Sequence, residues 1–295
     1  MAAAPASSVQ GPLAFLFAGA VDYAGLFPPA GLAMPAAVRE YGEQRWGQDA
    51  WALGRFVVGV EALDSLVAAR RDSTADVWPL SLLAASGDAP AISRFVGSQS
   101  SFTVEAIETK GASRDAIAAL APLTRLAAEV YVELPATADL ADLLPAVGSL
   151  GARAKLRTGG VTADAFPPSE QVARFMTACA RANIPFKATA GLHHLVRGEY
   201  ALTYAAGSPQ GTMFGFLNIF VASALARLGA PTRIIEEVLD ERAARAFDLR
   251  DDGLTWREVH LTSDDLRAAR ALISSFGSCS FREPMAELHT AFARI

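Results

Sequence analysis

Cysteine, histidine and lysine are scarce in this chain of 295 residues, and each scarcity has a consequence. The two cysteines, Cys179 and Cys279, are far apart in the sequence, which predicts a reducing compartment and no disulfide framework. The four histidines form no HxH or HExxH pattern, so we expect neither a metal site nor any other cofactor. Only three of the 26 basic residues are lysine. A coding bias toward arginine explains the ratio, but under it lysine persists more readily where an amine must lose its proton.

Long apolar runs and an excess of positive charge are also missing. The most apolar stretch, residues 214–226, is interrupted by Asn218 and falls short of the ~20 residues of a membrane-spanning helix. The first ten residues lack the basic start of a secretory signal. A formal net charge of −5, without any basic run, argues against nucleic acid and against an anionic membrane surface. We therefore expect a cytoplasmic protein. Its expected partners are further copies of the same chain, in a homo-oligomer, and a small-molecule substrate.

Apolar residues are abundant, at 52% of the chain, and they fall into short strand-like runs that alternate with helical patterns. Strands are expected at 14–19, 55–60, 78–84, 102–108, 129–134, 153–158 and 185–190. Helical patterns lie at 36–46, 61–71, 114–123 and 138–150. This alternation is typical of βα units with parallel strands, and so many units favour a closed (β/α)8 barrel of the TIM type. An open doubly wound sheet is the alternative, although no GxGxxG motif follows the first strand.

The C-terminal part breaks this rhythm. We expect residues 1–246 to form the barrel. Residues 214–228 are either the eighth strand running into its helix or one buried helix, because so apolar a run shows no period that separates the two. The eighth strand then lies at 214–220 or later. Residues 247–295 are expected to be an addition packed on the same domain. Within it, 247–261 reads as a hairpin around Asp251-Asp252-Gly253. The pattern SFRE at 280–283 is typical of the start of a helix.

Two of the three lysines occupy similar strand ends, AKLRTGG at 154–160 and FKATAGLHH at 186–194. Side chains alternate between the two faces of a strand. Lys155 and Arg157 therefore share one face, and Lys187 and Thr189 share a face of the next strand. Since the intervening residues of the first strand are apolar and suit the outer helices, the charged side chains should point into the barrel. Lys155 and Lys187 should then meet near its catalytic rim.

An amine beside another cation and partly removed from water has a lowered pKa, which makes it a nucleophile for carbonyl carbons. A nearby carboxylate would relieve that shift and could also move protons. Glu133 on the preceding strand is the first candidate, and Glu105 and Glu108 on the strand before it are others. The alternative is a structural ion network in which Lys155, Arg157 and these acids neutralise one another.

The block 154–192 resembles the region of strands 6 and 7 in class I aldolases of the deoxyribose-phosphate aldolase type. In that family, a lysine in K-x-S-T-G forms a Schiff base, and a second lysine in K-A-x-G-G-[IL] tunes it. Lys155 in K-L-R-T-G matches the first, and Lys187 in K-A-T-A-G-L matches the second. The segment VDYAGLFPPA at 21–30 is similar to the family's opening D-H-T-L-L segment, which implies that Asp22 lies at the rim.

The chain also departs from the family. Leu156-Arg157 stands where the family has small hydroxyl residues, and the family's proton-relay aspartate has no clear counterpart. Glu105 or Glu133 would have to take that role.

Residues for binding a substrate are expected around the same strand ends. Glycines there can let the backbone approach an anion, or they can simply serve turns that need positive φ. The pair His193-His194 could bind an anion, act as acid–base, ligate a metal or cap a loop. The expected substrate-binding residues are Asp22, Arg157, Gly159, Gly160, Thr189, Gly191, His193 and His194.

The sequence therefore predicts a cofactor-free class I aldolase or related carbon–carbon lyase acting on a small anionic carbonyl compound. The expected catalytic residues are Lys155, Lys187, Glu133 and Glu105. Two alternatives stay open: a barrel that binds a phosphorylated substrate without covalent chemistry, as a phosphoribosyltransferase or isomerase does, and a barrel that only binds or assembles. The loop at 22–31 fits an active site or an oligomer contact equally well, and the role of the loop at 276–283 is also open.

Overall fold

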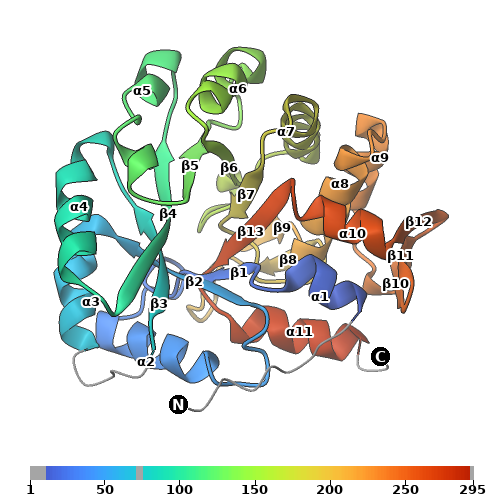
Figure 1. Ribbon diagram of the computed structural model, residues 1–295. Coiled ribbons are helices and arrows are strands. Elements are labelled where there is room, and N and C mark those ends of the chain that lie inside the picture. Colours follow the sequence, from blue (N-terminus) through green and yellow to red (C-terminus); the bar gives the residue numbers. More distant parts are fainter. Residues whose placement is uncertain (1–10, 71–75, 293–295) are drawn as a thin grey trace.

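A computed structural model describes residues 11–70 and 76–292 of the chain. Two parts of the sequence predictions lie outside these residues: the first ten residues, which lack the basic start of a secretory signal, and the end of the helix expected at 61–71. Eight parallel strands close into a barrel surrounded by helices (Figure 1), as the sequence predicts. In their order around the barrel the strands are β1 (Val21–Tyr23), β2 (Leu53–Gly59), β3 (Trp78–Leu83), β4 (Phe102–Lys110), β5 (Glu129–Glu133), β6 (Arg153–Arg157), β7 (Phe186–Thr189) and β13 (Ile273–Ser278).

The helices of the described residues surround the barrel (Figure 1). They are α1 (Pro12–Phe17), α2 (Met34–Gln44), α3 (Leu63–Ala69), α4 (Ala89–Ser98), α5 (Arg114–Ala118), α6 (Leu140–Ser149), α7 (Ser169–Ala182), α8 (Phe216–Arg227), α9 (Thr232–Leu239), α10 (Ser263–Ala269) and α11 (Arg282–Phe292). Short 3-10 helices lie at Val60–Ala62, Ser86–Asp88, Leu123–Arg125, Ala163–Ala165 and Ala244–Ala246. No helix of the described ranges is long and apolar enough to span a membrane.

One run expected to be a strand, and one run left open between a strand and a buried helix, are both helical. The run at 14–19 belongs to α1, whose proline in the first turn suits a helix start, and the strand follows at Val21–Tyr23. The run at 214–220 opens α8, in which every residue from Phe216 to Ala226 is buried. Phe216 stacks on Phe276 of β13, with ring centroids 5.2 Å apart. Burial on all sides removes the period that would have distinguished this helix from a strand.

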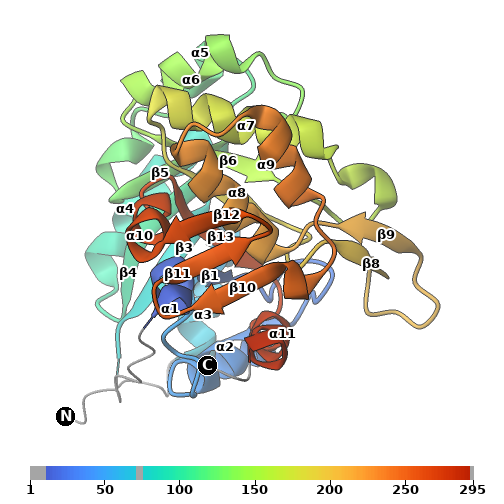
Figure 2. The same ribbon diagram turned by 90° about the vertical axis from the view of Figure 1, so that its right-hand side faces the viewer.

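The barrel is therefore not complete at residue 246, because its eighth strand is β13, inside the expected C-terminal addition. Between α9 and α10 the chain forms a three-stranded antiparallel sheet of β10 (Phe247–Arg250), β11 (Gly253–Trp256) and β12 (Val259–Thr262). Figure 2 shows this sheet on one flank of the barrel. The predicted hairpin is confirmed, with a third strand added to it. The helix expected after 280 is α11, and the Glu283 amide donates to Ser280 Oγ at 3.3 Å.

A second hairpin, not expected from the sequence, follows β7. It consists of β8 (Gly198–Ala201) and β9 (Gln210–Met213) and projects from the body of the molecule in Figure 2. Its first residues pack beside the strand end that carries His193 and His194, where Tyr200 stacks on His194 with ring centroids 3.4 Å apart.

The predicted alternation of faces is confirmed in the strands that carry the two lysines. Ala154 and Leu156 are 0% and 1% exposed and belong to the hydrophobic core. Lys155 pairs in register with Lys187 across β6 and β7. The two side chains thus enter the barrel interior at one level, which positions the site described next.

Candidate active site

Lys187 lies at the centre of the barrel interior and is fully buried. Its Nζ donates to Asp22 Oδ2 at 2.5 Å and to Glu108 Oε1 at 2.7 Å. Burial alone would lower the pKa of this amine, but the two carboxylates outweigh burial and raise the pKa above its ordinary value. Lys187 is therefore a buried cation.

Lys155, the register partner of Lys187, is 5% exposed. Its Nζ is 2.8 Å from Glu108 Oε2 and 2.9 Å from Glu133 Oε2. The sequence led us to expect an amine surrounded by cations. Instead, carboxylates hold the amine of Lys155 on two sides, and one of them also binds Lys187.

Glu108 bridges the two amines, one oxygen to each, and Ser81 Oγ donates to it at 2.7 Å. Burial raises the pKa of this carboxyl, but the Lys187 and Lys155 ammonium groups more than reverse the effect and hold the pKa far below its usual range. Glu133 behaves similarly: burial opposes ionisation, yet Lys155 and then Arg157 lower its pKa. Both carboxylates are therefore ionised at neutral pH.

Glu105 does not join this group, contrary to the expected role. It pairs with Arg55 at 3.1 Å and lines a polar cavity near the start of the strands, together with Glu129 and Arg153. The strand register shifts between Leu80 and Ser81 of β3, where it pairs with β4, so Glu105 and Glu108 both face inward at different levels. The sequence made Glu108 a candidate carboxylate but not an expected catalytic residue. In the structure, Glu108 occupies the position beside Lys155 that was expected for Glu105.

Asp22 is also displaced from the expected rim. It is 1% exposed and lies within the barrel, where it accepts hydrogen bonds from Lys187, from Ser275 Oγ at 2.8 Å and from the Arg55 amide at 2.9 Å. It does not line the cavity above Lys155. Asp22 fixes Lys187 rather than meeting a substrate.

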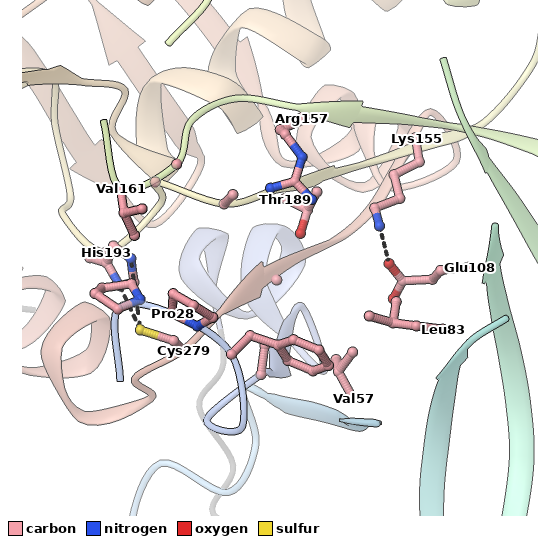
Figure 3. A pocket seen from close by; sticks show the side chains of 17 residues that line it. Pro28, Val57, Leu83, Glu108, Lys155, Arg157, Val161, Thr189, His193 and Cys279 are labelled. Carbon is pink, nitrogen blue, oxygen red and sulfur yellow. Dashed lines mark hydrogen bonds and ion pairs between the residues drawn. The ribbon is translucent and has the colours of Figure 1, made fainter. Parts of the chain in front are cut away.

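A cavity of about 290 Å³ opens above Lys155 and Glu108. Figure 3 shows these two residues on one side of the cavity and His193 with Cys279 on the other. The loop after β1, which the sequence assigned equally to an active site or an oligomer contact, forms part of the cavity wall. The lining residues are Ala24, Phe27, Pro28, Pro29, Val57, Leu83, Glu108, Lys155, Arg157, Gly160, Val161, Thr189, Ala190, Gly191, His193, Gly277 and Cys279.

Of the expected substrate-binding residues, Arg157, Gly160, Thr189, Gly191 and His193 line this cavity. The Arg157 side chain is 51% exposed, and its Nε lies 3.3 Å from Glu133 Oε1. No hydrogen bond within the described ranges occupies the Thr189 hydroxyl or the two terminal nitrogens of Arg157. These groups are available to a ligand.

Gly159 and Gly191 have a packing role beside any role toward a ligand. A Cβ on Gly159 would lie 2.4 Å from the Phe166 ring, and one on Gly191 would lie 2.6 Å from it. Gly191 also has φ of +72°, which favours glycine. Gly159 does not line the cavity, so its absence of a side chain is explained by Phe166.

The rings of His193 and His194 lie close together, with centroids 6.5 Å apart, but the two side chains have different partners. His193 is 7% exposed, and burial followed by the neighbouring His194 lowers its pKa to about 4, so it is neutral at pH 7. His194 Nδ1 lies 2.6 Å from Glu287 Oε1. The His194 side chain also lines a smaller cavity of about 190 Å³, together with Tyr200 and Tyr204. His194 is thus committed to α11 rather than to the cavity above Lys155.

Cys279 faces His193 across the end of the cavity, with Sγ 3.8 Å from Nδ1. Burial raises the pKa of this thiol to about 11, so at neutral pH the pair is a thiol and a neutral imidazole. The described residues hold no group of three or more potential ligands that could bind a metal ion.

Comparisons with known proteins identify no family for this chain. The sequence matches no protein-family model and no curated protein. Among solved structures it is similar to a point mutant of FabK from Thermotoga maritima, with 13% identity, 97% of this chain and 98% of that chain covered, and a TM-score of 0.41. At so low a score, this similarity supports no inference about the chain.

Proposed function

We propose that this barrel is a class I, Schiff-base carbon–carbon lyase that acts on a small anionic carbonyl compound. The single observation that carries the proposal is Lys155 at the floor of a cavity, its amine held by Glu108 and Glu133. A structural salt bridge needs no cavity beside it, whereas an amine that attacks a substrate does.

The charges of the network suit an imine. Lys155, Lys187 and Arg157 face Asp22, Glu108 and Glu133, so the group is neutral while the lysines are protonated. In the proposed step, the Lys155 ammonium and a carbonyl compound give a protonated imine and one water. The positive charge stays on the same nitrogen, and the two carboxylates that hold the ammonium stabilise the iminium equally well.

Glu133 moves the protons of this step. It accepts one proton from the Lys155 ammonium, which frees the nitrogen lone pair for attack. The proton then passes to the hydroxyl of the carbinolamine, which leaves as water. Lys187 does not touch the substrate: it is a positioning residue that keeps Glu108 ionised and directed at Lys155. In the cleavage step the iminium accepts the electron pair of the breaking carbon–carbon bond. Glu133, ionised again, takes the proton of the substrate hydroxyl, whose carbon leaves as an aldehyde.

The resemblance to deoxyribose-phosphate aldolases left the acidic proton-relay residue to Glu105 or Glu133. Glu133 reaches Lys155, at 2.9 Å, and Glu105 does not. Glu108 adds a second acidic residue beside the lysines. A carboxylate that touches both amines, at 2.7 and 2.8 Å, supports the same assignment.

Borohydride trapping tests the proposal. The protein is incubated with acetaldehyde, pyruvate, dihydroxyacetone phosphate and a wider set of carbonyl compounds, reduced, digested and mapped by mass spectrometry. The expected adduct lies on Lys155. Because the chain has three lysines, a matched control is simple: Lys110→Arg, at the exposed end of β4, keeps the adduct and Lys155→Arg loses it.

The same variants separate the alternative functions. A barrel that binds a phosphorylated ligand without covalent chemistry would keep its turnover in Lys155→Arg. An adduct on Lys110, or none with any compound, would refute the Schiff-base proposal.

A further inference from the structure

The cavity above Lys155 offers few polar groups to a substrate. Its walls are largely apolar, with Phe27, Pro28, Val57, Leu83 and Val161 among the lining residues. Figure 3 shows Val57 and Pro28 along the wall opposite Arg157 and Thr189. A substrate with a hydroxyl on every carbon would leave several of them without hydrogen-bond partners, at a large cost in affinity.

Arg157 is the one lining cation with donors to spare. Glu108 occupies both of its oxygens with Lys155, Lys187 and Ser81, so it has little left to offer. The two terminal nitrogens of Arg157 match a carboxylate in a bidentate pair. Among the lining side chains in the described part of the chain, Arg157 thus carries the charge left for a substrate, and the neutral polar groups are the Thr189 hydroxyl, the His193 imidazole and the Cys279 thiol. This set fits a monoanion better than a phosphorylated polyol.

Glu133 contacts both Arg157, which would bind the substrate carboxylate, and Lys155, which would react with the substrate carbonyl. One of its oxygens lies 2.9 Å from Lys155 Nζ and the other 3.3 Å from Arg157 Nε. The amine and the guanidinium are therefore separated by no more than one carboxylate group and its two contacts. A substrate with its carboxylate on or next to the carbonyl carbon fits within this separation.

The size of the cavity limits the rest of the molecule. At about 30 Å³ of space for each water-sized group, a volume of about 290 Å³ holds on the order of ten non-hydrogen atoms. A carboxylate and a carbonyl use five of these, including both carbons, so about five remain.

We infer, on the basis of the proposed function, that the substrate is a 4-hydroxy-2-oxo acid with about four further carbons, apolar apart from the C4 hydroxyl whose proton is removed in the cleavage step. Its carbonyl meets Lys155, its carboxylate meets Arg157 and Thr189, and its chain lies along Val57, Leu83 and Phe27. It is not a sugar phosphate, and the departure from the aldolase motif at Arg157 is what changes the specificity.

The test compares borohydride trapping on Lys155 by three compounds of similar length: 2-oxohexanoate, hexanal and glyceraldehyde 3-phosphate. We expect 2-oxohexanoate to reach half-maximal trapping at a concentration about tenfold below either of the others. Arg157→Gln should reduce the preference for 2-oxohexanoate over hexanal about tenfold. Arg114→Gln removes an equal charge at an exposed ion pair with Asp142 and should leave the preference unchanged. Equal trapping of the acid and the aldehyde, or best trapping by the phosphate, overturns the inference.

Failure of the proposed function would give a different result. If no compound forms an adduct, binding of hexanoate is measured by calorimetry, because it carries the same carboxylate and chain without a carbonyl. Hexanoate binding that weakens about tenfold in Arg157→Gln and not in Arg114→Gln supports the ligand class although the chemistry is wrong. Absence of hexanoate binding overturns the inference itself.

Discussion

Replacing Glu108 by glutamine removes one negative charge from between two buried lysines. The amide keeps the shape of the carboxylate, so the change tests charge rather than packing. Breaking a buried ion pair by removing one partner costs about 3–5 kcal/mol. Lys187 retains Asp22 at 2.5 Å and Lys155 retains Glu133 at 2.9 Å, which places Glu108→Gln at the lower end, about 3 kcal/mol.

The assay is reversible unfolding by urea and by heat at pH 7. At roughly 2 °C per kcal/mol for a chain of this size, the loss corresponds to about 6 °C in Tm. Glu105→Gln is the matched control on the same strand. The Glu105 side chain is 44% exposed, so its ion pair with Arg55 contributes less than about 1 kcal/mol.

The pH dependence gives a second check with a definite sign. The pKa of Glu108 is lower in the folded protein than its ordinary value of 4.5, so its stabilising effect is complete above that value. It is lost as the pH falls below 4.5, because the unfolded chain then binds a proton that the folded chain does not. The stability difference between the wild type and Glu108→Gln should therefore be constant from pH 5 to 8 and shrink in acid. Equal stability at pH 7, or a difference that does not shrink in acid, would refute the charge bridge.

The surroundings of the cavity give three further predictions. Gly191→Ala should destabilise the protein by about 1–3 kcal/mol, measured by urea unfolding, because it strains a positive φ and meets the Phe166 ring. His193, with a pKa of about 4, should show no titration between pH 5 and 8 in imidazole NMR spectra, and a midpoint near 6.5 would contradict its burial. Because burial raises the pKa of both Cys279 and Cys179, a thiol reagent at pH 7.5 should label neither in the native protein within minutes and both in urea.

The local pattern of the sequence was enough to place the two lysines. In 153–157, charged residues alternate with apolar ones, and the period of a strand then determines which face is buried against helices. The following strand repeats the pattern around Lys187. Parallel pairing of consecutive strands brings Lys155 and Lys187 into register, so this half of the site was predictable.

The acidic half of the site was not predictable in the same way. The two-residue period of a strand favours Glu105 and Glu133. The irregular pairing of β3 with β4 lets Glu108 face inward as well as Glu105. Glu108, further along the strand, is then the residue that reaches the lysines. An irregularity of this kind arises from the fit between neighbouring strands, and the sequence of one strand carries no sign of it. Asp22 was misplaced for a similar reason, because its height in the barrel depends on where β1 pairs with β13.

The sequence by itself determined that the chain forms a (β/α)8 barrel, because strand and helix patterns repeat along it as βα units. It also determined that Lys155 and Lys187 face the interior, because side chains alternate between the two faces of a strand with a period of two residues. Only the tertiary structure decided that β13, near the end of the chain, closes the barrel and that Glu108 joins the two amines. These depend on contacts between residues far apart in sequence, where packing and electrostatics act through space and leave no local period to read.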